Sequence, residues 1–481
     1  MDKERLEETL EGTKEKEKRR SPDKWKKTVW IGISVSLVIV AVLYVSGAIF
    51  FQQHFYPNTW IDGENYGWKN VIQVEDDIRN QTKSYELVIY GRDGVTDRIR
   101  GDEIEMEPLF DGSLEEIREK QNGFFWVPAL WSPKDYEIPR LVSYDDALFQ
   151  RKLSELEIFQ KRNIVSPQDA YIGEYDEKTN SYSIIAEKPG SDIHREEVVQ
   201  AIEEALSCLQ EELDLETIDC FTKPAVTSTT AWLNRVVNTL NKYVSAKIIY
   251  DWNGAREVID GTQIHNWLMV KQKNVVIDEE KVRGYVNELA KRNDTFGKKR
   301  EFQTTEGETI TLSSGSYGWW SDRSGETKEL VELIKKGETV EREPLYHARG
   351  YVKGQNDIGN SYVEIDLGRQ HLYLYIEGEL VLESDFVSGN VARGFATPAG
   401  VFGLTYKERH ATLKGTNYAT KVDYWMPFNG NIGMHDAGWR SSFGGDIYQT
   451  NGSHGCINLP KEAAAQIYDK IEQGFPIVCY H

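Results

Sequence analysis

The chain has 481 residues, too many for one hydrophobic core, and this length predicts about three domains. Hydrophobic residues make up 40% of the chain and charged residues 28%, which is typical of globular domains rather than of disordered chain. The formal net charge of −20 argues against a nucleic-acid partner, because binding to a phosphate backbone requires a basic face.

The first 51 residues predict a membrane anchor. Residues 1–27 contain ten Lys/Arg and eight Asp/Glu, and residues 28–51 contain no charge over 24 positions, enough to span a bilayer as a helix. A cleaved signal peptide would have a shorter apolar core, and the alternative is a buried helix of a soluble protein. The next twenty residues hold one basic residue, Lys69. The positive-inside bias therefore predicts a cytoplasmic tail over 1–27, a single transmembrane helix over 28–51 and an extracellular remainder.

Two stretches separated by 160 positions predict an internal repeat. Residues 84–104 and 245–264 each predict a strand, a tight turn at Asp93-Gly94 or Asn253-Gly254, and a second strand. In each copy a helix, another pair of strands and a second helix follow in the same order. The matched positions are Tyr90/Tyr250, Gly94/Gly254, Ile99/Ile259, Gly101/Gly261 and Ile104/Ile264. We expect two α+β modules that arose by duplication, at 52–227 and 228–345.

Cysteine and tryptophan residues in these modules leave alternatives open. Cys208 and Cys220 are 12 residues apart and could form a disulfide, or both could be buried thiols. Exposed aromatic rings can stack on sugars, although most are expected in the core. No single tryptophan is assigned to a ligand. Those considered are Trp252, Trp267, Trp319 and Trp320.

Residues 346–481 predict a mostly β domain. The segments SYVEIDL, HLYLYIEGE and LVLESDFVSG alternate in polarity, with turns at Gly368 and Gly378. One helix is predicted from Pro460 to Gly474. The last strand, FPIVCYH, places Cys479 as a packed thiol.

The stretch NGSHGCINLP predicts the reactive centre. Ser453, His454 and Cys456 lie within four positions, which favours nucleophilic catalysis over a zinc site, since structural zinc needs four ligands at paired spacings. A thiol near pKa 8.5 requires a base, and only the terminal histidine follows Cys456. The base must therefore be His435 or His454. Successive N–H groups at Gly455 and Cys456 could form an oxyanion hole.

The segment HDAGWRSSFGGDIYQTNGSHGCINL resembles the signature of L,D-transpeptidases (YkuD-like), and with TPAGVF and WMPF the resemblance covers about 350–481. It implies that Cys456 is the nucleophile and His435 the general base. It also implies that His454 and Gly455 shape the oxyanion site, while Ser453 and Asn458 support the loop. In this family a backbone carbonyl often orients the histidine, so little role is expected for the side chain of Asp436.

The upstream modules, including FYPNTWIDGENYGW and KPAVT, resemble the peptidoglycan-binding domains that precede such catalytic domains. The resemblance implies a cell-wall enzyme that forms 3→3 crosslinks between tetrapeptide stems through a cysteine acyl-enzyme. It further implies acylation by carbapenems and no need for a cofactor or metal. Two alternatives remain, namely an L,D-carboxypeptidase and a non-catalytic wall-binding scaffold.

Overall fold

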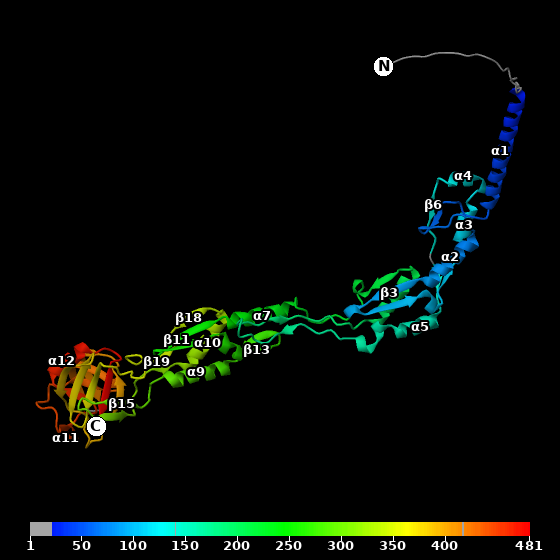
Figure 1. The fold of residues 1–481 in the computed structure, drawn as a ribbon. Helices are drawn as coiled ribbons and strands as arrows, with labels where there is room; N and C mark the ends of the chain where they lie inside the picture. Colours follow the sequence, from blue (N-terminus) through cyan, green and yellow to red (C-terminus); the bar gives the residue numbers. More distant parts are fainter. Residues whose placement is uncertain (1–21, 140, 416–417) are drawn as a thin grey trace, which may run out of the picture. The chain divides into compact units, whose positions relative to one another are not determined.

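The computed structural model of the protein describes residues 22–139, 141–415 and 418–481. The chain divides into two compact units, and Figure 1 labels their helices and strands. The first extends to Asp169 and resumes over Glu187–Ala225, and the second holds Ala170–Ala186 and Val226–His481. Of the predicted cytoplasmic tail, residues 1–21 lie outside the described residues.

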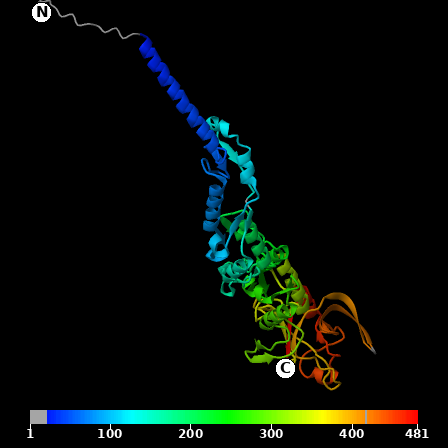
Figure 2. The ribbon, with the colours of Figure 1, turned by 90° about the vertical axis from the view of Figure 1, so that its right-hand side faces the viewer.

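The apolar N-terminal run forms one uninterrupted helix, α1 (Pro22–Phe50), in both views of the ribbon (Figures 1 and 2). Pro22 stands at the first helical position, where a missing N–H costs nothing because the first turn has no intrahelical acceptor. Over Trp25–Phe50 the mean hydropathy reaches 2.5, and among the described residues this is the one helix long and apolar enough to cross a membrane. Its side chains are exposed along most of its length, as expected of a helix whose partner lies outside the chain.

The first unit contains a three-stranded sheet in the order β10-β3-β4. Alternate residues of β3 and β4, among them Leu87, Ile89 and Ile99, face a core that α6 completes with Val198 and Ile202. The elements of this unit are β1 (Thr59–Ile61), β2 (Glu64–Asn65), α2 (Val71–Ser84), β3 (Glu86–Tyr90), η1 (Arg92–Gly94), β4 (Thr96–Arg100), η2 (Gly101–Ile104), β5 (Glu107–Leu109), α3 (Ser113–Glu119), η3 (Gly123–Phe125), α4 (Trp126–Ala129), β6 (Lys134–Tyr136), β7 (Leu141–Ser143), α5 (Asp146–Glu155), η4 (Glu157–Phe159), η5 (Lys161–Asn163), α6 (Arg195–Ser207), β10 (Glu212–Asp214) and η6 (Leu215–Thr217).

The second unit begins with a similar three-stranded sheet, in the order β12-β11-β18. Its core gathers Ile248 and Trp252 of β11 with Val282 of α9 and Leu330 of α10. The elements up to the C-terminal domain are β8 (Tyr171–Ile172), β9 (Ile184–Ile185), α7 (Ala231–Val244), β11 (Lys247–Trp252), β12 (Ala255–Ile259), α8 (Gly261–Ile264), η7 (His265–Trp267), β13 (Leu268–Lys271), β14 (Asn274–Ile277), α9 (Glu279–Asn293), β15 (Arg300–Gln303), β16 (Thr309–Leu312), β17 (Trp320–Ser321), α10 (Arg323–Lys336), β18 (Thr339–Arg342) and β19 (Tyr346–Ala348).

The two three-stranded sheets share their order of elements and their pairing. In each, a helix (α2 or α7) precedes an antiparallel hairpin (β3–β4 or β11–β12). The third strand of the sheet, β10 or β18, comes later in the chain and pairs in parallel with the first strand of the hairpin. Both predicted hairpin turns have two consecutive residues of positive φ, at 56° and 78° for Asp93-Gly94 and at 53° and 83° for Asn253-Gly254. This conformation, which Asn and Gly tolerate best, confirms the predicted turns.

The hairpin β8–β9 lies in the second unit, although its chain neighbours on both sides belong to the first. Tyr175 and Tyr182 of this segment pack against the core of the second unit, and the Asn180 side-chain amide donates to Val244 O at 3.1 Å. Residues 170–186, inside the predicted first module, are therefore grouped by packing with the elements of the second.

The hairpin β15–β16 similarly reaches the C-terminal domain within the second unit. Phe302 and Leu312 share a small core with Val401 and Tyr480, and the Ser314 hydroxyl donates to Ala399 O at 2.8 Å. The hairpin thus packs upon the domain that follows it in the chain.

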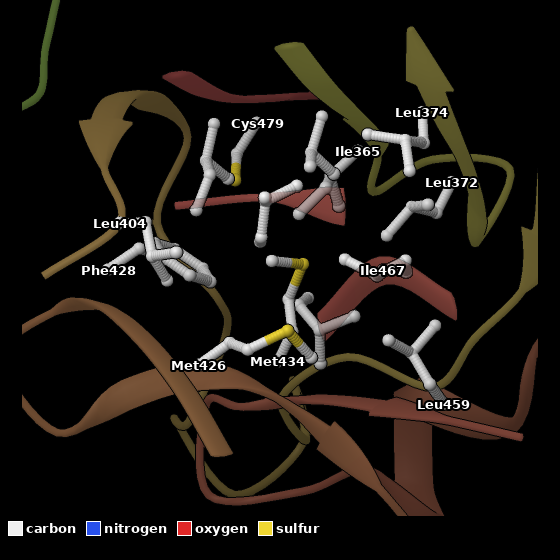
Figure 3. Packing of buried hydrophobic residues seen from close by; sticks show 14 of the residues in the cluster. Ile365, Leu372, Leu374, Leu404, Met426, Phe428, Met434, Leu459, Ile467 and Cys479 are labelled. Carbon is white, nitrogen blue, oxygen red and sulfur yellow. The ribbon is translucent and has the colours of Figure 1, made fainter. Parts of the chain in front are cut away.

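The C-terminal domain consists of two sheets that enclose one core. The sheets have the orders β22-β21-β20-β28-β23 and β24-β25-β26-β27. Figure 3 shows side chains of both sheets, such as Ile365 and Met434, meeting Ile467 of α12. The elements are β20 (Tyr362–Asp366), β21 (His371–Ile376), β22 (Glu379–Asp385), β23 (Gly400–Gly403), β24 (Glu408–Gly415), β25 (Tyr418–Asn429), β26 (Ile432–Asp436), α11 (Ile447–Asn451), β27 (Ile457–Leu459), α12 (Lys461–Lys470) and β28 (Pro476–Tyr480).

The mostly β character of this domain, its helix after Pro460 and the packed Cys479 are confirmed. All four cysteines, each within the described ranges, are free thiols, with Cys208 exposed and Cys220 buried, so the structure has no bridge between them. Of the four tryptophans considered, three are buried in the core and Trp320 is 43% exposed.

Candidate active site

Three neighbouring strands bring the predicted catalytic residues to one face of a sheet. His435 on β26 lies opposite Trp425 on β25 and opposite Asn458 on the parallel strand β27. Cys456 precedes Asn458 by two residues, and side chains two apart in an extended segment share a face. Cys456 also packs against the cluster that contains Trp425, whose ring centre is 5.9 Å from that of His435. His435 and Cys456 therefore both lie beside the cluster that contains Trp425.

His435 is held by hydrogen bonds at both ring nitrogens. It is 3% exposed, with Nδ1 2.8 Å from the backbone oxygen of Asp436 and Nε2 3.0 Å from the side-chain nitrogen of Asn458. The Arg440 Nε–H donates to Asn458 Oδ1 at 2.8 Å. Because arginine only donates, the oxygen of the Asn458 amide must face it and the NH₂ group must face His435. Nε2 then accepts, and the ring proton resides on Nδ1.

This arrangement leaves the imidazole neutral with a lone pair on Nε2. Burial lowers the pKa of His435 below its ordinary value, and the carbonyl of Asp436 opposes that shift by stabilising the charged form. The orienting group is thus a backbone carbonyl, as the family resemblance implies. The Asp436 side chain instead accepts from the backbone N–H groups of Asp423 and Tyr424 at 2.8 and 2.9 Å.

The environment of Cys456 favours the protonated thiol over the thiolate. Burial raises the pKa of its sulfur above the ordinary thiol value, while the backbone N–H of Gly433 lowers it by donating to the thiolate. The S–H group donates to the backbone oxygen of Asn431, with Sγ and O 3.5 Å apart. Burial therefore disfavours the charged form of both groups, the thiolate and the imidazolium.

The loop before Cys456 is closed by the hydroxyl of Ser453. That hydroxyl donates to Cys456 O at 2.6 Å and accepts from the Gly455 N–H at 3.0 Å. Gly455 has φ of 118°, and a Cβ at this position would lie 3.2 Å from Ile432, so glycine is required. The predicted support role of Ser453 has a clear geometric basis. The sequence predicts that the Gly455 N–H faces a substrate oxygen. In the structure this N–H instead donates to the Ser453 hydroxyl within the loop.

His454, the other predicted base, is exposed and lies against Phe395, with ring centres 4.7 Å apart. It is His435, and not His454, that belongs to the buried hydrogen-bonded chain with Asn458 and Arg440. His435 is therefore the candidate base.

Several residues around the loop were not singled out from the sequence. The strand-like segment 387–390 anchors the loop through backbone bonds, including Ser453 N–H to Ser388 O and Asn390 N–H to Ser453 O, both at 2.9 Å. The Thr397 hydroxyl donates to Gly455 O at 2.7 Å. Thr397 and Arg440 lie in TPAGVF and HDAGWR, two of the segments that carry the family resemblance. Their place in these segments is the sequence signal that could have identified them. Within the described ranges, His, Cys, Asp and Glu form no group of three that could hold a metal ion.

Comparisons with known proteins identify two domains of this chain. A family model described as the L,D-transpeptidase catalytic domain (YkuD) matches residues 360–479, and one described as "Putative peptidoglycan binding domain" matches residues 227–341. A comparison with curated proteins gave no match.

Solved structures of L,D-transpeptidases are similar to this chain in sequence. The carbamoyl enzyme that Ldtfm forms with avibactam is 35% identical over 51% of this chain and 97% of its own, with a TM-score of 0.43. A cysteine-to-serine mutant of the Enterococcus faecium L,D-transpeptidase is 35% identical over 50% of this chain and 98% of its own, with a TM-score of 0.43. The catalytic domain from E. faecium acylated by ertapenem is 42% identical over 25% of this chain and 98% of its own, with a TM-score of 0.24. With a catalytic domain over 360–479 and a peptidoglycan-binding domain before it, the chain belongs to the L,D-transpeptidase family.

Proposed function

We propose that this protein is a membrane-anchored L,D-transpeptidase that crosslinks peptidoglycan outside the cell through an acyl-enzyme on Cys456. The proposal is supported by a buried His435 whose Nε2 accepts a hydrogen bond from Asn458, the residue two positions after the Cys456 thiol. A general base must be able to receive the proton of its nucleophile, and this tautomer is the one that can.

In the first step His435 Nε2 takes the proton of Cys456 while the sulfur attacks the carbonyl of the diamino acid at stem position three. As Nε2 is protonated it releases the hydrogen bond from Asn458, and the Asp436 carbonyl stabilises the imidazolium through Nδ1. The C–N bond to the terminal D-alanine breaks, and the imidazolium gives its proton to the leaving amine. The product is a thioester on Cys456.

The tetrahedral intermediate carries an oxyanion that requires N–H donors. Because Gly455 N–H already serves Ser453, the Cys456 N–H is the main donor in this account, and His454 with Gly455 fixes the shape of the loop. The hydroxyl of Ser453 holds Cys456 O and thereby sets the peptide plane that follows the nucleophile.

In the second step the side-chain amine of a neighbouring stem attacks the thioester. A C–N bond forms, the C–S bond breaks, and the sulfur regains a proton, which gives a 3→3 crosslink. Water attacking the same thioester would instead make the protein an L,D-carboxypeptidase. No cofactor enters either route, since the energy of the crosslink comes from the peptide bond that is broken.

The remainder of the chain would hold this domain in the wall. Helix α1 would span the membrane from residue 28 onward with residues 1–27 in the cytoplasm. The shared order of elements in the two sheets supports duplicated wall-binding modules. Protease added to intact, wall-stripped cells should then remove everything after about Phe51, and protection of the catalytic domain would contradict this topology.

The proposed reaction is tested with the purified full chain and defined tetrapeptide stems. Mass spectrometry should find crosslinked dimers that have lost one terminal D-alanine per crosslink. Tripeptides without dimers would assign the carboxypeptidase reaction instead. Unchanged stems would favour a non-catalytic wall-binding scaffold.

A further inference from the structure

An uncharged aromatic segment of the first unit lies beside the C-terminal end of α1. Residues 123–131 read GFFWVPALW, and they form η3 and α4. Figure 2 shows this part of the chain next to the end of the helix, and the contacts agree. A run of nine residues with four aromatic rings and no charge is unusual for the surface of an acidic ectodomain.

The segment is fastened to the helix by hydrogen bonds and by close backbone approach. The Tyr44 hydroxyl donates to Phe124 O at 2.7 Å, and the Trp126 indole N–H donates to Tyr44 O at 3.0 Å. Glycine is required on both sides: a Cβ at Gly123 would lie 2.2 Å from Ala48 O, and a Cβ at Gly47 would lie 2.5 Å from the Trp126 ring. The segment is therefore held at a fixed level along α1.

That level coincides with the outer end of the apolar helix. Tyr44 to Phe50 make up the last seven residues of α1, about 10 Å at 1.5 Å per residue. The uncharged run of 24 residues is about 36 Å long, somewhat more than the roughly 30 Å of a hydrocarbon core. Residues 123–131 thus lie where the helix would pass from hydrocarbon to headgroups.

Three aromatic side chains of the segment are exposed, and the fourth stacks on a ring at the end of α1. Phe124, Phe125 and Trp131 are 52%, 62% and 77% exposed, and the Trp126 ring stacks on Phe51 at 5.6 Å. Trp68, which follows β2 in the chain, is 52% exposed and also lies beside this end of the helix. Its ring centre is 5.0 Å from that of Phe51. Tryptophan and tyrosine concentrate at membrane interfaces because one side of each ring is apolar and the other polar.

The segment belongs to an insertion between two strands, β5 and β7, that form a separate two-stranded sheet after the hairpin β3–β4. It lies in the connection from β5 to β7, which pair as β13 and β14 do in the second unit. There the connection is the two-residue turn Gln272-Lys273. In the first unit the connection instead runs over residues 110–140 and is tied back by β6, which pairs with β1. The extra residues are thus found only in the copy that is joined directly to α1.

We propose that residues 123–131 form a second membrane contact, an aromatic collar that enters the headgroup boundary of the outer leaflet beside α1. The collar adds a second contact with the bilayer surface at the base of the ectodomain, beside the one that α1 makes. This inference rests on the proposed membrane anchor, and its occupant is lipid because the collar continues the lipid-facing surface of the helix.

The test uses the full chain reconstituted in phosphatidylcholine–phosphatidylglycerol vesicles whose lipids carry bromine near the headgroup end of the acyl chains. Bromine quenches tryptophan fluorescence at short range. Quenching is measured as the fluorescence intensity lost to bromine per molecule of protein. Trp131→Phe should lower this loss, and Phe125→Trp should raise it. Trp320→Phe, which removes an exposed ring from the second unit, is the matched control and should leave quenching unchanged.

A separate variant distinguishes failure of the collar from failure of the anchor. Trp30→Phe removes a ring from α1 itself and should lower quenching if the helix lies in the bilayer. Suppose that quenching falls in Trp30→Phe but does not change in Trp131→Phe or Phe125→Trp. This result would contradict the collar while supporting the anchor. The exposed aromatic surface would then be assigned to a protein partner. Unchanged quenching in all variants would contradict the anchor and the collar together.

Discussion

Asn458 and His435 lie opposite each other on neighbouring parallel strands, and the Asn458 amide donates to His435 Nε2 at 3.0 Å. Arg440 fixes the orientation of that amide from its other side. The nitrogen that must receive the thiol proton is therefore kept unprotonated by a neutral donor. We infer that Asn458 is a positioning residue that acts through His435, in addition to supporting the loop.

Replacing this amide by a carboxylate should change the pH dependence of acylation. In Asn458→Asp a negative charge would face Nε2 and raise the pKa of His435, by roughly one unit or more for a close opposite charge. The acid limb of the acylation rate by a carbapenem should then move to higher pH. Asn458→Ala, which adds no charge, is the control, and its acid limb should not move upward. Equal profiles for both variants would show that Asn458 has only a structural role.

The wild-type enzyme should keep its base active in mildly acidic solution. Burial lowers the pKa of His435 below its ordinary 6.5, so the neutral base persists as pH falls through that value, and the acid limb should lie below it. The same shift makes folding stability decline with falling pH from about 6.5 downward, because the unfolded chain then binds the proton more readily. Measuring acylation rate against pH tests the first statement, and an acid limb above 6.5 would contradict it.

Removing the hydroxyl of Ser453 should disorder the loop that carries the nucleophile. Ser453→Ala deletes one bond to Cys456 O and one from Gly455 N–H, at a cost of about 1–2 kcal/mol in the free energy of unfolding. The acylation rate should fall as well, since the peptide next to the nucleophile loses its fixed plane. Ser453→Thr keeps the hydroxyl and should restore both quantities. Full acylation activity in Ser453→Ala would show that the Ser453 hydroxyl is not needed for the reaction.

Local sequence signals were sufficient for much of the fold. Period-two alternation in SYVEIDL and HLYLYIEGE marked β20 and β21, and the Asn253-Gly254 pair marked a turn that needs two positive φ angles. The spacing of His435 and Cys456 predicted a reactive pair through its resemblance to the family signature. Each of these signals involves residues within one element or one loop, where spacing alone determines what the side chains can do.

Contacts between distant segments could not be predicted in this way. The bond from Arg440 to Asn458 depends on the parallel register of β26 and β27, and nothing in either segment fixes that register. The packing of residues 170–186 in the second unit depends on Tyr175 and Tyr182 meeting a core formed elsewhere. The collar likewise requires residues 123–131 to return to α1, some 80 positions earlier in the chain.

The most direct test of the central claim is the mass of the intact protein after incubation with a carbapenem. The wild type should gain the mass of one β-lactam, and Cys456→Ala should gain none while remaining folded. Cys208→Ala, which removes the exposed thiol outside the catalytic domain, is the control and should still form the adduct. Buried Cys479 should not react, because burial raises its pKa far above the ordinary range. An adduct that persists in Cys456→Ala would show that another residue is the nucleophile and would contradict the proposed mechanism.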